Sequence, residues 1–148
     1  KLVRVAQTPT VSSGSIYAAK DCVGAGLTFA NAARASGGAC EIRAVQLVDK
    51  GQQMAALDLL FFDRAIGTAT DNSAFDPTDT ELGQCVGGFS ILATDYADLN
   101  DNSVASITDI GLSVVLNGTS LYGQLVARGT PTYTSTTDIV VTVTVAQL

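Results

Sequence analysis

The chain has 148 residues, a length typical of one domain that can bury a hydrophobic core without disulfides or metal. Its 14 acidic and 8 basic residues give a net charge of −6, and this balance argues against nucleic-acid binding, which needs clustered Lys and Arg. The sequence has no histidine, which excludes Ser-His-Asp and Cys-His catalytic centres and histidine-ligated zinc. Hydrophobic residues make up 47% of the chain, so disorder is excluded as well.

Short strands separated by turns are predicted for the first third of the chain. Three of them end at residues that favour turns or loops, namely Thr8-Pro9, the glycines at 24 and 26, and Asp49-Lys50-Gly51. The predicted strands, in chain order, cover residues 2–6, 17–22, 27–30 and 39–48.

Residues 55–63 form the strongest core segment of the sequence. In a strand, Leu57, Leu59 and Phe61 share one face, and Leu60 and Phe62 share the other. Helix is the competing prediction, because most of residues 54–60 are good helix formers. The paired phenylalanines and the short length favour a strand covered on both sides.

Residues 64–84 form a long connection rich in Thr, Asp, Asn and Gly, and a loop of this length is usually functional. One helical turn is expected inside it. Asp76 is a candidate N-cap, Pro77 suits the first helical position, and Asp79 and Glu81 favour the positive N-terminal end of a helix.

The remaining strands complete an all-β pattern with turn signals at intervals typical of sandwiches and barrels. Asn117-Gly118 is expected to form a tight hairpin turn. In the last strand, Val141, Val143 and Val145 are expected to face inward and Thr142 and Thr144 outward. We therefore predict a single-domain antiparallel β-sandwich over residues 1–148, jelly-roll-like, with at most one short helix. The remaining strands named at the start of this paragraph are predicted at residues 85–93 (interrupted by Gly87-Gly88), 103–107, 112–116, 121–127 and 139–146.

The N-terminal segment, residues 1–14, is β-prone at its start and then polar, with Pro9 separating it from the body. Because terminal segments are poorly ordered unless something holds them, we expect an extended arm that contacts another chain and is ordered only there. Residues 64–84 are the second candidate contact. The alternative is that residues 2–6 pair inside their own sandwich.

No catalytic, cofactor-binding or metal residues can be assigned from motifs. Cys22, Cys40 and Cys85 are odd in number and far apart, which favours small buried hydrophobes over disulfides or a metal site. The residues from Asp98 to Asp109 have the ligand spacing of an EF-hand calcium loop, but Ser103 stands where glycine is needed. An Asx-rich turn is the favoured interpretation, and no cofactor is expected.

Two groups of carboxylates are also interpreted as turn makers, helix caps and solvated loop acids. A glycosidase would need two of them held across a sugar, and the scarcity of aromatic platforms disfavours this role. These groups comprise Asp71, Asp76, Asp79 and Glu81, and then Asp95, Asp98, Asp101 and Asp109.

The sequence contains four informative stretches, at residues 27–32, 56–62, 70–75 and 120–133. They resemble a family of small virion structural proteins from tailed-bacteriophage genomes, encoded near the major capsid protein. The resemblance implies a non-enzymatic capsid decoration (cement) protein, a group that includes β-sandwiches and jelly rolls assembled as trimers. It also implies that the major capsid protein is the partner, on the capsid surface, after synthesis in the host cytoplasm.

Assembly with copies of the chain or with a partner agrees with the composition, and the resemblance favours a trimer. Aromatic residues are only 6%, so much of the apolar content is small and buries little area per side chain. No apolar run reaches the length of a membrane span, and residues 1–5 are followed by no apolar stretch of a signal peptide, so we expect no membrane partner. The alternatives are another virion part (tail, neck or fibre-associated) and a carbohydrate- or cell-surface-binding β-module.

Overall fold

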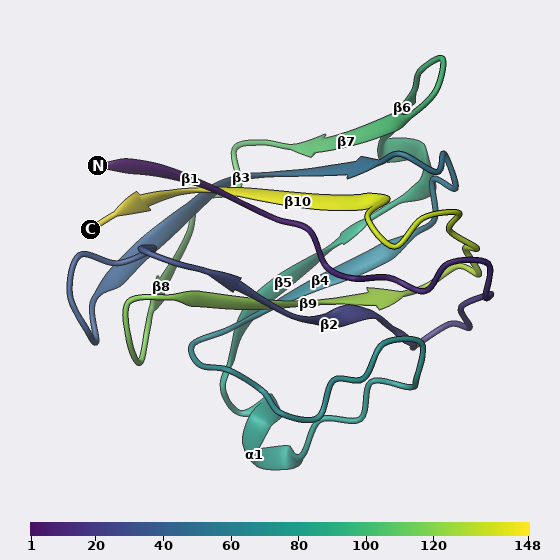
Figure 1. Ribbon diagram of the computed structural model, residues 1–148. Helices are drawn as coiled ribbons and strands as arrows, with labels where there is room; N and C mark the ends of the chain where they lie inside the picture. The colour runs from purple at the N-terminus through teal and green to yellow at the C-terminus, as the bar shows by residue number, and fades with distance from the viewer.

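Two antiparallel β-sheets pack face to face in the computed structural model, which describes residues 1–148 (Figure 1). The larger sheet has the order β1 (Leu2–Gln7), β10 (Ile139–Gln147), β3 (Ala39–Asp49), β7 (Ser103–Ile107) and β6 (Tyr96–Asp98), and β8 (Leu112–Val115) also pairs with β3. The smaller sheet has the order β2 (Cys22–Phe29), β9 (Leu121–Ala127), β4 (Leu57–Phe62) and β5 (Cys85–Ile91).

The strand order is that of a jelly roll. β7 and β8 lie end to end beside β3, since they pair with its residues 45–49 and 39–42 respectively, and together they occupy one position. The strand pairs are nested along the sequence, from the first and last strands to the middle ones: β1 pairs with β10, β2 with β9, β3 with β7 and β8, and β4 with β5. β6 adds an edge strand beside β7. The predicted all-β sandwich is confirmed.

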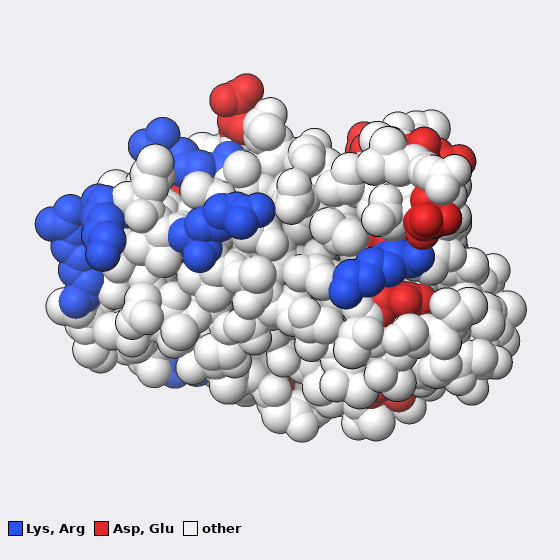
Figure 2. Space-filling view, turned by 45° about the horizontal axis from the view of Figure 1, so that its top comes forward, with Lys and Arg blue, Asp and Glu red and all other residues white.

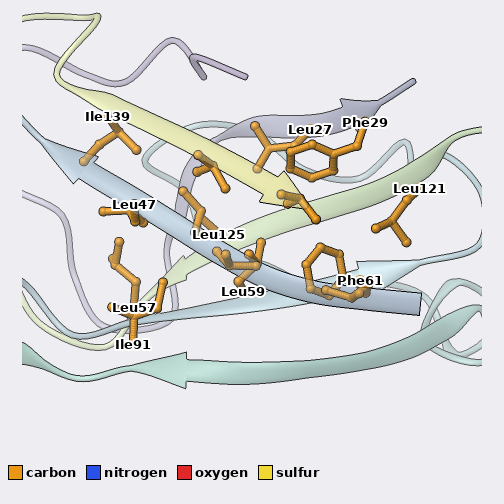
Figure 3. Close-up of a cluster of buried hydrophobic side chains, with 14 of the residues drawn as sticks. Leu27, Phe29, Leu47, Leu57, Leu59, Phe61, Ile91, Leu121, Leu125 and Ile139 are labelled. Carbon is orange, nitrogen blue, oxygen red and sulfur yellow. The ribbon is translucent and has the colours of Figure 1, made fainter. Parts of the chain in front are cut away.

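The core lies between the sheets and is built by strands with alternating apolar residues (Figure 3). In β4, Leu57, Leu59 and Phe61 are fully buried, and the Phe61 ring centroid lies 6.3 Å from that of Phe29 in β2. The strand prediction for residues 55–63 is therefore confirmed over β4. On the other face of β4, Phe62 is buried and Leu60 is half-buried, so cover on that side is only partial.

The C-terminal strand β10 has the expected orientation. Val141, Val143 and Val145 are buried between the sheets. Thr142 and Thr144 lie on the opposite face of β10, where Thr144 pairs with Ala44 of β3. The register shift between Thr144 and Val145 leaves Arg43 of β3 as an extra residue, a bulge that bends β3 at this point.

Residues 17–22 were expected to form a strand, and this prediction is wrong. Residues 18–21 form a turn in which the Asp21 carboxylate accepts from the Ala18 N–H at 2.9 Å, and Lys20 has a φ of 78°. The strand begins instead at Cys22 and continues through the glycines that were expected to end it. Gly24, with φ +75°, forms a bulge there, and a Cβ at this position would lie 2.5 Å from the Pro9 Cβ.

At the edges of the sheets, one further expectation fails and one strand was not predicted. Asn117-Gly118 closes no hairpin, because it links β8 of the larger sheet to β9 of the smaller one. There the Asn117 N–H donates to the Asp63 carbonyl, and the Gly37 N–H donates to the Gly118 carbonyl. β6 was not predicted, since three residues carry too little pattern to identify a strand.

The expected helical turn is α1 (Asp79–Leu82), and a short 3₁₀ helix, η1 (Ala93–Asp95), precedes β6. Thr78, not Asp76, is the N-cap of α1. Its hydroxyl accepts from the Glu81 N–H, while the Glu81 carboxylate accepts from the Thr78 N–H. This reciprocal capping box stabilises a helix of only four residues.

Candidate functional site

The N-terminal segment belongs to its own sandwich. β1 pairs antiparallel with β10 from Leu2↔Ala146 to Gln7↔Val141, at the edge of the larger sheet. Beyond β1, Val11 is buried and its N–H donates to the Thr136 carbonyl. The expectation that residues 1–14 form an arm ordered only against another chain is therefore wrong, because main-chain pairing with β10 is available within the chain.

Residues 64–84 cover the outer face of the smaller sheet and are held there by Asp71. The Asp71 carboxylate accepts from the Tyr17 hydroxyl at 2.6 Å, from the Ser12 hydroxyl at 2.6 Å and from the Gly24 N–H at 2.7 Å. Burial, together with the hydrogen bond to Asp71, raises the pKa of Tyr17 to about 12. Asp71 thus joins three segments that are distant in the sequence.

Glu81 cross-links the same loop internally. Its carboxylate accepts from the Gly67 N–H and from the Thr68 hydroxyl, both at 3.0 Å, in addition to capping α1. The N–H of Thr78 is the main cause that lowers the pKa of Glu81. Phe75 of the loop packs against Phe62 with ring centroids 6.4 Å apart. The loop is therefore a fixed cover over this sheet.

The window from Asp98 to Asp109 forms a hairpin, with Asp98 at the end of β6 and Asp109 beyond the far end of β7. Ser103, at the sixth position, is buried, and its hydroxyl donates to the Asp49 carbonyl at 3.0 Å. Nowhere in the chain do three or more Cys, Asp or Glu side chains gather as a potential metal site. Residues 99–102 form the turn of the hairpin, in which the Leu99 N–H donates to the Asn102 carbonyl at 2.9 Å.

Two buried aspartates, Asp49 and Asp138, were missed by sequence reasoning. The Asp49 carboxylate accepts from the Gly51 and Met54 N–H groups at 2.9 and 3.0 Å. The Asp138 carboxylate accepts from the Thr134 N–H at 3.0 Å. Burial raises the pKa of Asp49, although the main-chain donors act in the opposite direction. Both carboxylates close turns at one end of the sandwich.

The three cysteines are free thiols. Cys22 and Cys40 are buried, and burial raises the pKa of Cys22 and raises that of Cys40 to about 11. Cys85, in β5, is half-buried. The expectation of small buried hydrophobes is confirmed for Cys22 and Cys40, whose thiols are poorly suited to forming a thiolate nucleophile.

The outer face of the larger sheet has no covering segment comparable to residues 64–84, and it is hollowed at one end. Two adjacent hollows, of about 490 and 180 Å³, share the short side chains of Ala44 and Thr144 as their floor. Leu2 and Arg4 of β1 line them, as do Asp109 and the ion pair of Arg43 with Glu41 in β3. We call these two hollows the outer-face groove.

The same face carries an apolar row at its other end. Strand register places Val140 beside Val48, Val48 beside Val104, and Val104 beside Ala97, across four strands. The valines are half-buried and Ala97 is exposed. We call these four residues the valine row. Side chains this short and apolar can meet a flat protein surface without leaving a charge unpaired.

Charges are separated along this face. Figure 2 shows that Lys and Arg side chains gather mostly toward one end and Asp and Glu side chains mostly toward the other. Arg4 and Arg43 lie at the outer-face groove, where Glu41, ion-paired with Arg43, and Asp109 are also present. Asp95, Asp98 and Asp101 are exposed at the end formed by η1 and the β6–β7 hairpin.

No protein-family model matches the sequence, and no curated protein matches it either. The helices are also too short and too polar for any of them to cross a membrane. The inference about function therefore depends on the geometry of the surfaces described above.

Proposed function

We propose that the protein is a non-enzymatic virion structural protein, a capsid decoration (cement) protein that binds and stabilises the assembled head of a tailed phage. The observation that carries the proposal is the open outer face of the larger sheet with its valine row. A contiguous apolar row on an uncovered sheet face is typical of a surface that contacts protein.

The use of the polar groups agrees with a passive role. The side chains of Asp49, Asp71 and Asp138 all accept hydrogen bonds from main-chain N–H groups. Glu81 does the same within the loop over the smaller sheet. Since these carboxylates hold turns and loops in place, they support a rigid building block more than a reaction centre.

A carbohydrate-binding module is the alternative from another class, because jelly rolls occur in both capsid and lectin domains. Sugar sites commonly use an exposed aromatic ring as a platform. In this chain every Phe and Tyr is buried or half-buried, and the exposed large hydrophobics are all aliphatic. This observation favours the virion role.

The partners in this proposal are the major capsid protein and further copies of the chain, with a trimer favoured. The protein would be made in the host cytoplasm and would then cover the capsid surface. Its net charge of −6 suits that position, because an acidic protein does not compete for packaged DNA.

The test uses phage heads assembled without this protein, to which the purified chain is added before sedimentation. We expect saturable binding and greater resistance of the decorated heads to heating. Val104→Arg places a long charged side chain in the valine row and should abolish co-sedimentation. Thr80→Arg, on exposed α1 at the opposite side of the sandwich, is the matched control and should bind normally. Failure of the unmodified chain to bind would overturn the proposal.

A further inference from the structure

We infer that Asn117-Gly118 is a site of spontaneous main-chain modification, at which the asparagine side chain cyclises onto the next residue and then opens to aspartate or isoaspartate. The pair lies in the connection between β8 and β9, which crosses from the larger sheet to the smaller one. Figure 1 shows this connection at one end of the sandwich, beside the loop between β2 and β3. The site needs only the fold and is independent of the capsid role.

The two reacting groups of the pair are free of hydrogen bonds. The nucleophile is the main-chain nitrogen of Gly118, whose N–H donates to no acceptor in the chain. The electrophile is the side-chain amide of Asn117, which is exposed and makes no hydrogen bond either. The Asn117 side chain can therefore rotate until its Cγ meets the Gly118 nitrogen in a five-membered ring.

Gly118 also leaves the approach to its nitrogen open. A Cβ at this position would meet no other heavy atom within 4 Å, so the space around the glycine is empty. A side chain on the residue after asparagine hinders ring closure, and glycine has none. Among asparagine pairs, Asn-Gly is therefore the one that cyclises most readily.

The main chain on both sides of the reacting nitrogen is held by the fold. The Asn117 N–H donates to the Asp63 carbonyl at 3.1 Å, and the Gly118 carbonyl accepts from the Gly37 N–H at 3.2 Å. These hydrogen bonds use the groups that do not react. They fix the connection in place and leave the Gly118 nitrogen available.

The other four asparagines lack this combination of features. Asn72 is the nearest rival, because serine is also a small successor, but the Ser73 N–H is engaged and donates to the Thr70 carbonyl at 3.2 Å. Each of the other three is followed by a residue with a side chain, and none by glycine. These three are Asn31, Asn100 and Asn102.

The reaction is hydrolytic and needs no co-reactant except water. The Gly118 nitrogen gives up its proton and bonds to Cγ of Asn117, the Cγ–Nδ2 bond breaks, and ammonia leaves with that proton. Water then opens the resulting succinimide at one of its two carbonyls. Opening at the side-chain carbonyl gives aspartate, and opening at the main-chain carbonyl gives isoaspartate, in which the main chain runs through Cβ and Cγ.

The two products affect the fold differently. Both add one negative charge to a chain whose net charge is −6. Aspartate keeps the main chain as it is. Isoaspartate lengthens the connection between the sheets by one methylene group, which moves the Gly118 carbonyl relative to the Gly37 N–H and weakens that hydrogen bond.

The experiment follows the masses of proteolytic peptides by mass spectrometry while the purified, folded chain ages in mildly alkaline buffer. We expect the mass gain of amide-to-carboxylate conversion in the peptide that contains residue 117, with isoaspartate detected by enzymatic methylation. Gly118→Ala adds a methyl group in open space and should slow the gain by at least about tenfold. Gly67→Ala, also in open space, is the matched control and should age like the unmodified chain.

Hydrogen exchange at Gly37 tests the effect on the connection. We expect faster exchange in the aged, isoaspartate-containing chain than in Asn117→Asp, which carries the same added charge on an unaltered main chain. A chain in which residue 117 stays asparagine during ageing would overturn the inference. It would also be overturned by conversion of Asn72 before Asn117, or by a Gly118→Ala variant that gains mass at the unmodified rate. Equal exchange at Gly37 in the two chains would overturn the effect of isoaspartate on the fold.

Discussion

At the scale of single residues, the core depends on a few large side chains between the sheets, and the loops depend on buried polar ones. Phe61 illustrates the first group, with its ring centroid 5.6 Å from that of Phe89 in β5 and 6.3 Å from that of Phe29 in β2. Tyr17 illustrates the second, because its ring packs on Tyr133 while its hydroxyl bonds Asp71.

Phe61→Ala should lower the free energy of unfolding by about 3–5 kcal/mol, the range for a fully buried phenylalanine that leaves a cavity. Urea unfolding measures the change. Leu82→Ala is the control, because Leu82 is 52% exposed and should leave stability nearly unchanged. A loss under about 1 kcal/mol for Phe61→Ala would contradict the burial of β4 between the sheets.

Alkaline pH should destabilise the protein through its buried tyrosines. The ordinary pKa of 10.0 is raised to about 12 at Tyr17, and burial also raises the pKa of Tyr96 and Tyr133. A pKa raised by folding means that stability is fully present below pH 10 and is lost as the pH rises through the folded-state value. Thermal melts between pH 8 and 12, read with phenolate absorbance, should show a falling midpoint; a constant midpoint would contradict the buried tyrosine sites.

At the scale of elements, residues 64–84 form a cover that Asp71 attaches to the rest of the chain and that Glu81 cross-links within itself. Glu81→Ala should release the loop around α1, because the Gly67 N–H, the Thr68 hydroxyl and the Thr78 N–H lose their acceptor together. Faster hydrogen exchange confined to the loop is the expected result. Asp79→Ala, in the same helix, is the control, since no hydrogen bond of its side chain is disturbed.

Acidic pH should have the same effect as Glu81→Ala. The pKa of Glu81 is lowered by its main-chain donors, so its contribution is present above the ordinary pKa and is lost as the pH falls through the folded-state value. If hydrogen exchange in the loop stays slow in the Glu81→Ala variant, the result would contradict this role of Glu81 and would show that Asp71 and Phe75 alone hold the loop.

β1 is an edge strand of its own sheet, and its deletion tests the corrected role of the N-terminus. Removing residues 1–10 should lower the unfolding midpoint strongly, because β10 loses one of its two pairing partners and the core loses Val3 and Val5. Arg4→Ala, which changes an outward-facing side chain of β1, should unfold like the unmodified chain. A truncated chain with an unchanged midpoint would restore the interpretation of a detachable arm.

Strands with a long local pattern could be predicted from the sequence, and features set by distant contacts could not. Alternation in β10 and the apolar run of β4 identify both strands. The local sequence predicts that Gly24 ends a strand. In the structure β2 continues through Gly24 as a bulge, because Pro9 packs against it and the Asp71 carboxylate accepts from its N–H. Asp71 is one of several acidic residues in its loop, and nothing in the local sequence distinguishes it from the others. Only the fold brings its carboxylate to Ser12, Tyr17 and Gly24.

At the scale of the whole molecule, the outer faces of the two sheets differ: one is covered and the other is open. Residues 64–84 cover the smaller sheet, whereas the larger sheet leaves the valine row and the outer-face groove open. In the proposed function the valine row contacts the capsid. A rigid block with an open contact face can then stabilise a lattice without any reaction.

The copy number of the protein in purified phage particles tests its role most directly. Gel densitometry against the major capsid protein measures this ratio. A decoration protein covers the whole capsid surface, so we expect a number of copies comparable with that of the major capsid protein. A faint band, with a small fraction of that number, would indicate a neck or tail part and would contradict the decoration role, and absence from the particle would contradict any virion role.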